Sequence, residues 1–182
     1  MVLVIAAVGL VTGLIALALI PRLGVVSAFS LTGFFWWLVV IAVVTLVPAN
    51  GPTGYRSPDS VQTSCSWDIG GPAPEGFWIF DGGQRTLNTA LFVPAGALLV
   101  LAFGRWRSGW LLVPLGLAGL LAYSAAIEKT QLELARIDRA CDITDIIDNG
   151  TGAVFGFGIG LVLLLILRPW RHRHRRLAAR GR

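Results

Sequence analysis

The sequence predicts an all-α integral membrane protein, a bundle of about five transmembrane helices. Its mean hydropathy of +0.72 is far above that of a soluble domain, and only 14% of its 182 residues are charged. Five apolar runs are long enough to cross a bilayer, because about 20 residues at ~1.5 Å each span the hydrocarbon. No Gly/Ser linker divides the chain. We therefore expect one transmembrane domain over residues 1–170 and a basic tail over residues 171–182.

The first two apolar runs carry no acidic residue. Val2–Ile20 has no basic residue before it, and Pro21 and Arg22 close it, so we expect a retained span and not a cleaved signal peptide. Phe29–Pro48 forms the second run, after a short connection at residues 21–28. Four consecutive aromatic residues in this run fit either a belt at the lipid–water boundary or simple packing against lipid.

A polar loop separates the second run from the third. Residues 49–86 contain enough Gly and Pro to exclude a long helix, and loops of this length are usually functional or mobile. The third run, Leu87–Gly104, opens with Asn88. It also contains Pro94, which frees a backbone carbonyl and commonly bends a span.

Polar residues gather where the fourth and fifth runs meet. The runs cover residues 108–127 and about 146–167, and six of the ten acidic residues fall within residues 124–160. If the fourth helix continues past its apolar run, one of its faces carries Ser124, Glu128 and Gln131. In the fifth helix, residues three or four apart form a single stripe, which comprises Asp142, Asp145, Asn149, Gly152, Gly156 and Gly160. Small residues spaced by four let a neighbouring helix approach closely, so the glycines should form an inter-helix contact.

The distribution of positive charge predicts which side of the membrane each connection occupies. Ten arginines and no acidic residue lie in residues 21–28, in residues 104–109 and after the fifth run. The loops at residues 49–86 and 128–145 hold five positive and nine of the ten acidic residues, and the tenth, Asp148, follows within three residues. Short, positively charged connections stay in the cytoplasm. We therefore expect the N-terminus outside, the C-terminus inside and one long extracytoplasmic loop, and no role for the net charge of +5 in binding nucleic acid.

The two cysteines fall in the two predicted outer loops. Cys65 lies in the first and Cys141 in the second, and the chain has no other cysteine. An even pair on the oxidising side of the membrane predicts a disulfide. Such a bond would tie the long loop over the polar residues; the alternative is two free thiols.

The polar stripe predicts a binding or structural network at one face of the membrane. Ionisable groups at membrane depth are costly, usually pair with one another and mark functional sites. Arg136 or Arg139 is the expected counter-ion, because guanidinium bridges carboxylates in a forked geometry. Glu133 and Asp138 are expected to be simply solvated. The candidate binding residues are Asn88, Ser124, Glu128, Gln131, Arg139, Asp142, Asp145 and Asn149.

The motifs in these segments resemble those of the VanZ-like family of bacterial membrane proteins. The matching residues are Ser124, Glu128, Gln131, Arg139, Asp142, Asp145, Asn149, Gly152 and Gly156, with Thr45–Pro48 and Asn88, Leu91, Phe92, Pro94 and Gly96 at the ends of two other spans. The resemblance covers about residues 30–165. It implies a role in the cell envelope or in antibiotic susceptibility, since the family is named after a protein associated with resistance to the glycopeptide teicoplanin. The chain departs from the family pattern in Cys141, where an aromatic residue is common, and in its longer outer loop.

Three functions compete on this evidence. The first is a non-enzymatic, multi-pass protein of the bacterial cell membrane, with an outward-facing polar site that binds or shields an envelope lipid, a lipid-linked cell-wall intermediate or an amphiphilic, glycopeptide-type antibiotic. The second is an intramembrane enzyme that acts on a lipid headgroup, with Glu128 or Asp145 as general acid or base. The third, a transporter, is least favoured because the charges lie only near one end of the spans. We expect no metal and no cofactor.

Overall fold

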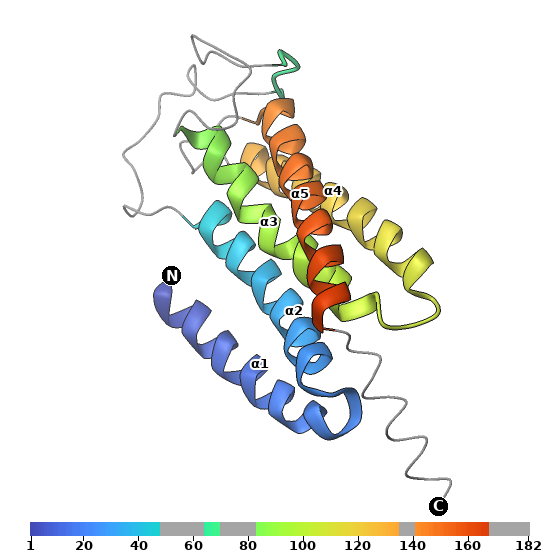
Figure 1. The fold of residues 1–182 in the computed structure, drawn as a ribbon. Coiled ribbons are helices and arrows are strands. Elements are labelled where there is room, and N and C mark those ends of the chain that lie inside the picture. The colour runs from blue at the N-terminus through green and yellow to red at the C-terminus, as the bar shows by residue number, and fades with distance from the viewer. Residues whose placement is uncertain (48–63, 70–82, 135–140, 168–182) are drawn as a thin grey trace, which may run out of the picture.

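Five long helices run up and down in the computed structural model (Figure 1). The structure describes residues 1–47, 64–69, 83–134 and 141–167. The helices are α1 (Val2–Leu23), α2 (Val25–Leu46), α3 (Gln84–Phe103), α4 (Gly109–Leu134) and α5 (Ile143–Leu167). Within these ranges, all five are long and apolar enough to cross a membrane. The predicted all-α membrane fold is confirmed. Most of the long loop at residues 49–86 and the tail at residues 171–182 lie outside the described residues.

The helices are longer than the apolar runs that predicted them. The connection expected at residues 21–28 is reduced to a turn at Gly24, whose φ of 80° lies in the left-handed region that favours glycine. Pro21 lies inside the last turn of α1 and does not end it. At the other end of the bundle, α4 continues to Leu134, well past the expected end at Ile127. A helix pairs its own backbone groups, so it can carry polar side chains into the bundle interior without exposing its peptide groups.

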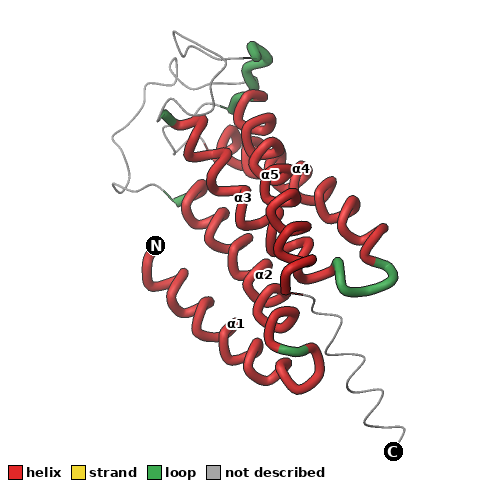
Figure 2. The backbone as a smooth tube through the Cα atoms, in the orientation of Figure 1, coloured by secondary structure: helices red, strands yellow, loops and turns green. Residues whose placement is uncertain are grey.

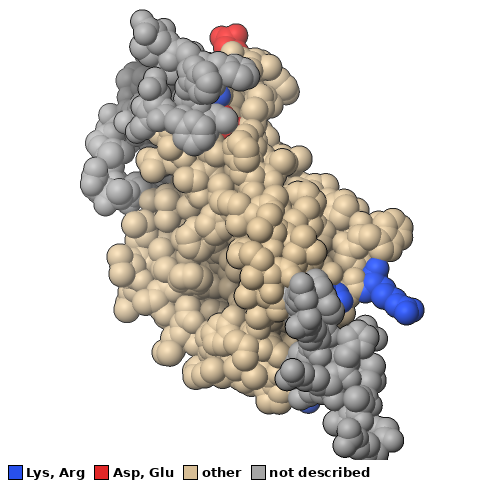
Figure 3. Space-filling view, in the orientation of Figure 1, with Lys and Arg blue, Asp and Glu red and all other residues tan. Residues whose placement is uncertain are grey.

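The two ends of the bundle differ in charge. We call the end where α2 and α4 finish and α3 and α5 begin the polar end, and the opposite end the basic end. Figure 2 shows the two short turns of the basic end, between α1 and α2 and between α3 and α4. In Figure 3, the arginines of this end and the acidic residues of the polar end lie at opposite extremes of the described surface. The guanidinium of Arg105 donates a hydrogen bond to the carbonyl of Leu23, which joins the two turns.

Helices α3 and α5 pack backbone against backbone. A Cβ atom at Gly152 would overlap the carbonyl oxygen of Thr89, and one at Gly156 would overlap that of Val93. On the facing helix, a Cβ at Gly96 would overlap a carbonyl oxygen of α5. The spacing of these glycines predicted an inter-helix contact, and the structure identifies the partner as α3.

The hydrophobic core lies between α2, α3, α4 and α5. Its fully buried members include Ile41, Phe92 and Leu99. Helix α1 lies at the edge of the bundle, and of its residues only Ala16 is buried. Most of its surface is therefore available to lipid.

Two tryptophans of α2 join helices through hydrogen bonds, a role that the sequence reasoning missed. The indole Nε1 of Trp36 donates to the carbonyl of Ile5 on α1, at 3.0 Å. Nε1 of Trp37 donates to the carbonyl of Leu91 on α3, at 2.8 Å. This carbonyl is the neighbour of the one that Pro94 leaves without its helical donor. The aromatic run therefore anchors α1 and supports α3 at its proline.

Candidate functional site

The predicted polar residues are buried at the polar end of the bundle. Glu128 is only 3% exposed, although it is a carboxylate. The other buried members are Asn88, Ser124, Gln131, Asp145 and Asn149, and Asp142 is half-buried. Arg139 lies outside the described residues, as does Arg136, so their expected role as counter-ions stays a prediction. Their burial shows that these side chains belong to the bundle interior.

Two hydrogen bonds define a polar seam between α4 and α5. Nδ2 of Asn149 donates to Oγ of Ser124 at 2.9 Å, and both residues are buried. One turn further along α4, Oε2 of Glu128 accepts from the backbone N–H of Asp142 at 3.3 Å. Asp145 is buried on α5 between these two contacts. We call this set of five residues the α4–α5 seam.

Gln131 extends the polar contacts from α4 to α2. Its Nε2 donates to the backbone carbonyl of Thr45 at 3.1 Å, so Gln131 holds the ends of α2 and α4 together. Three buried oxygen atoms at this end have no hydrogen-bond partner among the described residues: Oε1 of Gln131, Oδ1 of Asn149 and Oγ1 of Thr89. Buried acceptors in a folded protein normally have a partner.

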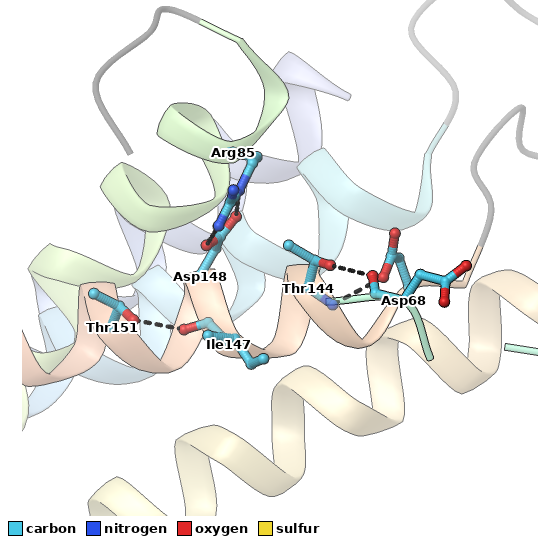
Figure 4. Close-up of polar contacts among 7 residues, drawn as sticks. Asp68, Arg85, Thr144, Ile147, Asp148 and Thr151 are labelled. Carbon is cyan, nitrogen blue, oxygen red and sulfur yellow. Dashed lines mark hydrogen bonds and ion pairs between the residues drawn. The ribbon is translucent and has the colours of Figure 1, made fainter. Parts of the chain in front are cut away.

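Arg85 and Asp148 form a forked ion pair that the sequence reasoning missed. Nε of Arg85 lies 2.8 Å from Oδ2 of Asp148, and Nη2 lies 2.9 Å from Oδ1. Figure 4 shows Arg85 reaching from α3 to Asp148 on α5. The Asp148 side chain is 2% exposed and that of Arg85 is 24% exposed. Two parallel N–H···O bonds of this kind fix orientation as well as charge.

The register of α3 against α5 explains why this pair forms. Stepping along α3 from Arg85 by four residues reaches Thr89 and then Val93, and the same steps along α5 from Asp148 reach Gly152 and Gly156. Thr89 and Val93 are the residues whose carbonyls meet those glycines. The ion pair therefore continues the tight helix contact into the polar end.

The described part of the long loop is fixed to the start of α5. We call residues 64–69 the strap. The predicted disulfide between Cys65 and Cys141 is present. Beside it, the N–H of Ser66 donates to the carbonyl of Cys141 at 2.9 Å, and the N–H of Ile143 donates to the carbonyl of Ser66 at 3.1 Å. Ser66 and Asp142 thus form an isolated parallel β-bridge, which holds the strap beside the start of α5.

Side chains complete the attachment of the strap and cap α5. Oδ1 of Asp142 accepts from the N–H of Thr144 at 2.9 Å, which is the contact of a helix N-cap. Oγ1 of Thr144 donates to the carbonyl of Asp68 in the strap at 3.2 Å (Figure 4). Asp142, the acidic residue at the start of the predicted stripe, therefore caps α5 in addition to its contact with Glu128 in the seam.

The part of the chain that contains these residues matches a known protein family. A family model described as VanZ/LLP1 matches residues 34–166. The chain belongs to the VanZ/LLP1 family. The match begins within α2 and ends within α5, so it contains the seam, the strap and the Arg85–Asp148 pair, and it leaves out α1. This VanZ/LLP1 protein is a multi-pass membrane protein with five membrane-length helices in the described ranges. The searches of curated proteins and of solved structures returned no significant match.

Proposed function

We propose that this VanZ/LLP1 chain is a non-enzymatic protein of the bacterial cell membrane, whose polar end faces out of the cell. There it binds or shields an envelope lipid, such as a lipid-linked cell-wall intermediate, or an amphiphilic, glycopeptide-type antibiotic. The observation that carries the proposal is the α4–α5 seam, with Glu128 and Asp145 buried within two membrane-length helices. Charged groups in such positions are costly and mark functional sites.

The charge distribution supports the outward orientation. Arg22, Arg105 and Arg107 lie at the basic end, and the arginine-rich tail follows the end of α5 there. Positive connections of this length remain in the cytoplasm. The strap, which is bound through a disulfide, lies at the opposite end, and disulfides persist in oxidising compartments.

Binding is favoured over catalysis because polar residues of the seam, and Gln131 beside it, are held by helix-to-helix hydrogen bonds. Ser124 accepts from Asn149, and Gln131 donates to the α2 backbone. Such contacts hold the buried polar groups in fixed positions, and recognition requires polar groups that are held in place. The strap is bonded to the first residues of α5, next to Asp142 of the seam, and its Trp67 is exposed.

Gene deletion tests the proposal in cells. We expect the deletion strain to change its susceptibility to glycopeptide or lipopeptide antibiotics. Wild-type protein and Glu133→Gln should restore the phenotype, and Glu128→Gln should not. Glu133 is the matched control because it lies on the same helix and carries the same charge, but its side chain is 66% exposed. Unchanged susceptibility to every drug of both classes after deletion would count against the proposed role.

The alternative is an intramembrane enzyme that acts on a lipid headgroup or a lipid-linked intermediate. The observation that favours it is the placement of two buried carboxylates, Glu128 and Asp145, in one seam, where one could act as general base and the other as acid. Purified protein would then convert a lipid-linked cell-wall intermediate, as followed by mass spectrometry. A product that wild-type protein forms and Glu128→Gln does not form would establish the enzyme in place of the binding protein.

A further inference from the structure

We propose that the Cys65–Cys141 disulfide is a redox switch for the α4–α5 seam, which is complete only in the oxidised protein. The disulfide fixes the backbone just before α5, and this backbone supplies an N–H group to the buried carboxylate of Glu128. The inference rests on the proposed function, because the seam is the site that the switch regulates.

Two consecutive residues connect the strap to the seam. Cys141 forms the disulfide with Cys65, and its carbonyl accepts from the N–H of Ser66 at 2.9 Å. The next residue, Asp142, donates its own N–H to Oε2 of Glu128 at 3.3 Å. The disulfide and the contact with Glu128 are therefore one residue apart in the chain. A shift of the backbone at Cys141 must move the N–H of Asp142.

Glu128 depends on the position of this backbone segment. The residue is 3% exposed, and a buried carboxylate is costly unless hydrogen bonds or opposite charges replace its water. The N–H of Asp142 supplies one such bond, from the residue before the first turn of α5. If this N–H is withdrawn, Glu128 loses part of what stabilises it in the interior, and an arrangement that returns the carboxylate to water is favoured.

The disulfide is the covalent link among the contacts that hold the strap. The other contacts are the two backbone hydrogen bonds at Ser66 and the bond from Thr144 to the carbonyl of Asp68 (Figure 4). The strap buries little apolar surface, since Trp67 and Ile69 are each 77% exposed. After reduction, these few bonds must offset the entropy of holding a long loop in one place, a cost that a closed disulfide removes. We therefore expect the strap to leave α5 when the disulfide is reduced.

The two sulfur atoms differ in their access to a reductant. Cys141 is 1% exposed, whereas Cys65 is half-buried. One thiolate of a dithiol reductant would therefore attack Sγ of Cys65, and Cys141 would leave as a thiolate. The second thiol of the reductant then attacks the mixed disulfide, which releases Cys65 and oxidises the reductant to its own disulfide. Two electrons pass to the protein, and each released thiolate takes up one proton.

Chemical labelling of carboxylates tests the switch. Purified full-length protein in detergent is treated with a carbodiimide and an amine, either oxidised or after reduction with dithiothreitol and alkylation, and labelled peptides are quantified by mass spectrometry. We expect reduction to raise the labelling rate of Glu128 about tenfold or more, because the stabilisation from a disulfide commonly exceeds the free energy of a tenfold change. An unchanged labelling rate of Glu128 overturns the inference.

Two other carboxylates show whether the opening is local. Glu133 on α4, 66% exposed, should be labelled equally in both states. Asp148 on α5, 2% exposed and paired with Arg85, should stay protected in both states. If reduction exposes Asp148 as strongly as Glu128, the whole bundle has opened and the switch is overturned. Cys65→Ser should show the reduced pattern without reductant, and dithiothreitol should not change that pattern.

The labelling experiment uses wild-type protein without ligand, so its result depends neither on the proposed function nor on the folding of a variant. Unchanged labelling overturns the switch and leaves the proposed function standing. Unchanged antibiotic susceptibility after gene deletion counts against the proposed function and leaves the labelling result intact. In the deletion strain, Cys65→Ser should fail to restore the phenotype at an abundance in the membrane that matches wild type. Full restoration would show that the seam works without the disulfide, which overturns its regulation by the switch.

Discussion

Breaking the Arg85–Asp148 pair should destabilise the bundle far more than breaking an exposed pair. Arg85→Met leaves the Asp148 carboxylate, which is 2% exposed, without its two hydrogen bonds. Removing one partner of a buried pair costs about 3–5 kcal/mol. Because the Arg85 side chain is 24% exposed and water can reach it, we expect the lower part of that range, about 3 kcal/mol.

A double variant and a matched control separate charge from packing. Replacing both charges with apolar residues is often close to neutral, so Arg85→Met with Asp148→Leu should recover to within about 1 kcal/mol of wild type. The control is Lys129→Met, which breaks the Lys129–Glu133 pair, 3.7 Å apart, with side chains 75% and 66% exposed. Exposed pairs of this kind contribute only about 0.5 kcal/mol or less.

Titration with sodium dodecyl sulfate in mixed micelles, followed by circular dichroism, gives the free energy of unfolding for each variant. Two results would refute the reasoning. One is a loss in Arg85→Met no larger than in Lys129→Met. The other is a double variant whose loss equals the sum of the losses in Arg85→Met and in Asp148→Leu measured alone, because that would mean that Arg85 and Asp148 act independently.

Three further predictions use the same titration. Gly156→Val should cost about 1–3 kcal/mol because its side chain would meet the α3 backbone. Gly158→Ala should be neutral or stabilising by up to ~1 kcal/mol, because no atom outside its own helix backbone lies within 4 Å of the added Cβ. Equal losses at both positions would contradict the packing of α3 against α5. Cys65→Ser should lower stability by at most about 4–5 kcal/mol for a disulfide with a sequence separation of 76 residues, and mass spectrometry of non-reduced wild-type protein should find no free thiol. Trp36→Phe should cost about 0.5–1.5 kcal/mol through the lost bond to α1, while Trp110→Phe, 78% exposed, should cost nothing measurable.

The helices and the disulfide were predictable because their signals are local or unique. Each span is an apolar run of bilayer length, and two cysteines allow only one intramolecular pairing. The glycine contact was predictable from spacing alone, since Gly152, Gly156 and Gly160 share one face of a helix. The ends of the helices were less predictable, because two polar residues after Ile127, Glu128 and Gln131, are buried in the bundle and the helix continues past them.

The Arg85–Asp148 pair depends on tertiary register, which one sequence does not display. Arg85 lies 63 residues before Asp148 in the chain, in a segment that the sequence assigns to a loop, while Arg136 and Arg139 are much nearer neighbours. The spacing of four residues from Arg85 to Val93, and from Asp148 to Gly156, predicts the ion pair only once α3 is known to pack against α5. The hydrogen bonds of Trp36 and Trp37 escaped prediction for the same reason, since hydropathy does not distinguish an indole facing lipid from one that donates to another helix.

The most direct test of the central claim, that the polar end is a binding site, is the set of lipids that the protein retains from its own membrane. Wild-type protein, Glu128→Gln and Glu133→Gln would be extracted with a membrane-solubilising polymer, and the bound lipids identified by mass spectrometry. The account predicts that one lipid class is enriched over the bulk membrane in wild-type protein and in Glu133→Gln, and that the enrichment disappears in Glu128→Gln. Bulk-membrane composition in all three samples, or the same enrichment in all three, would contradict it.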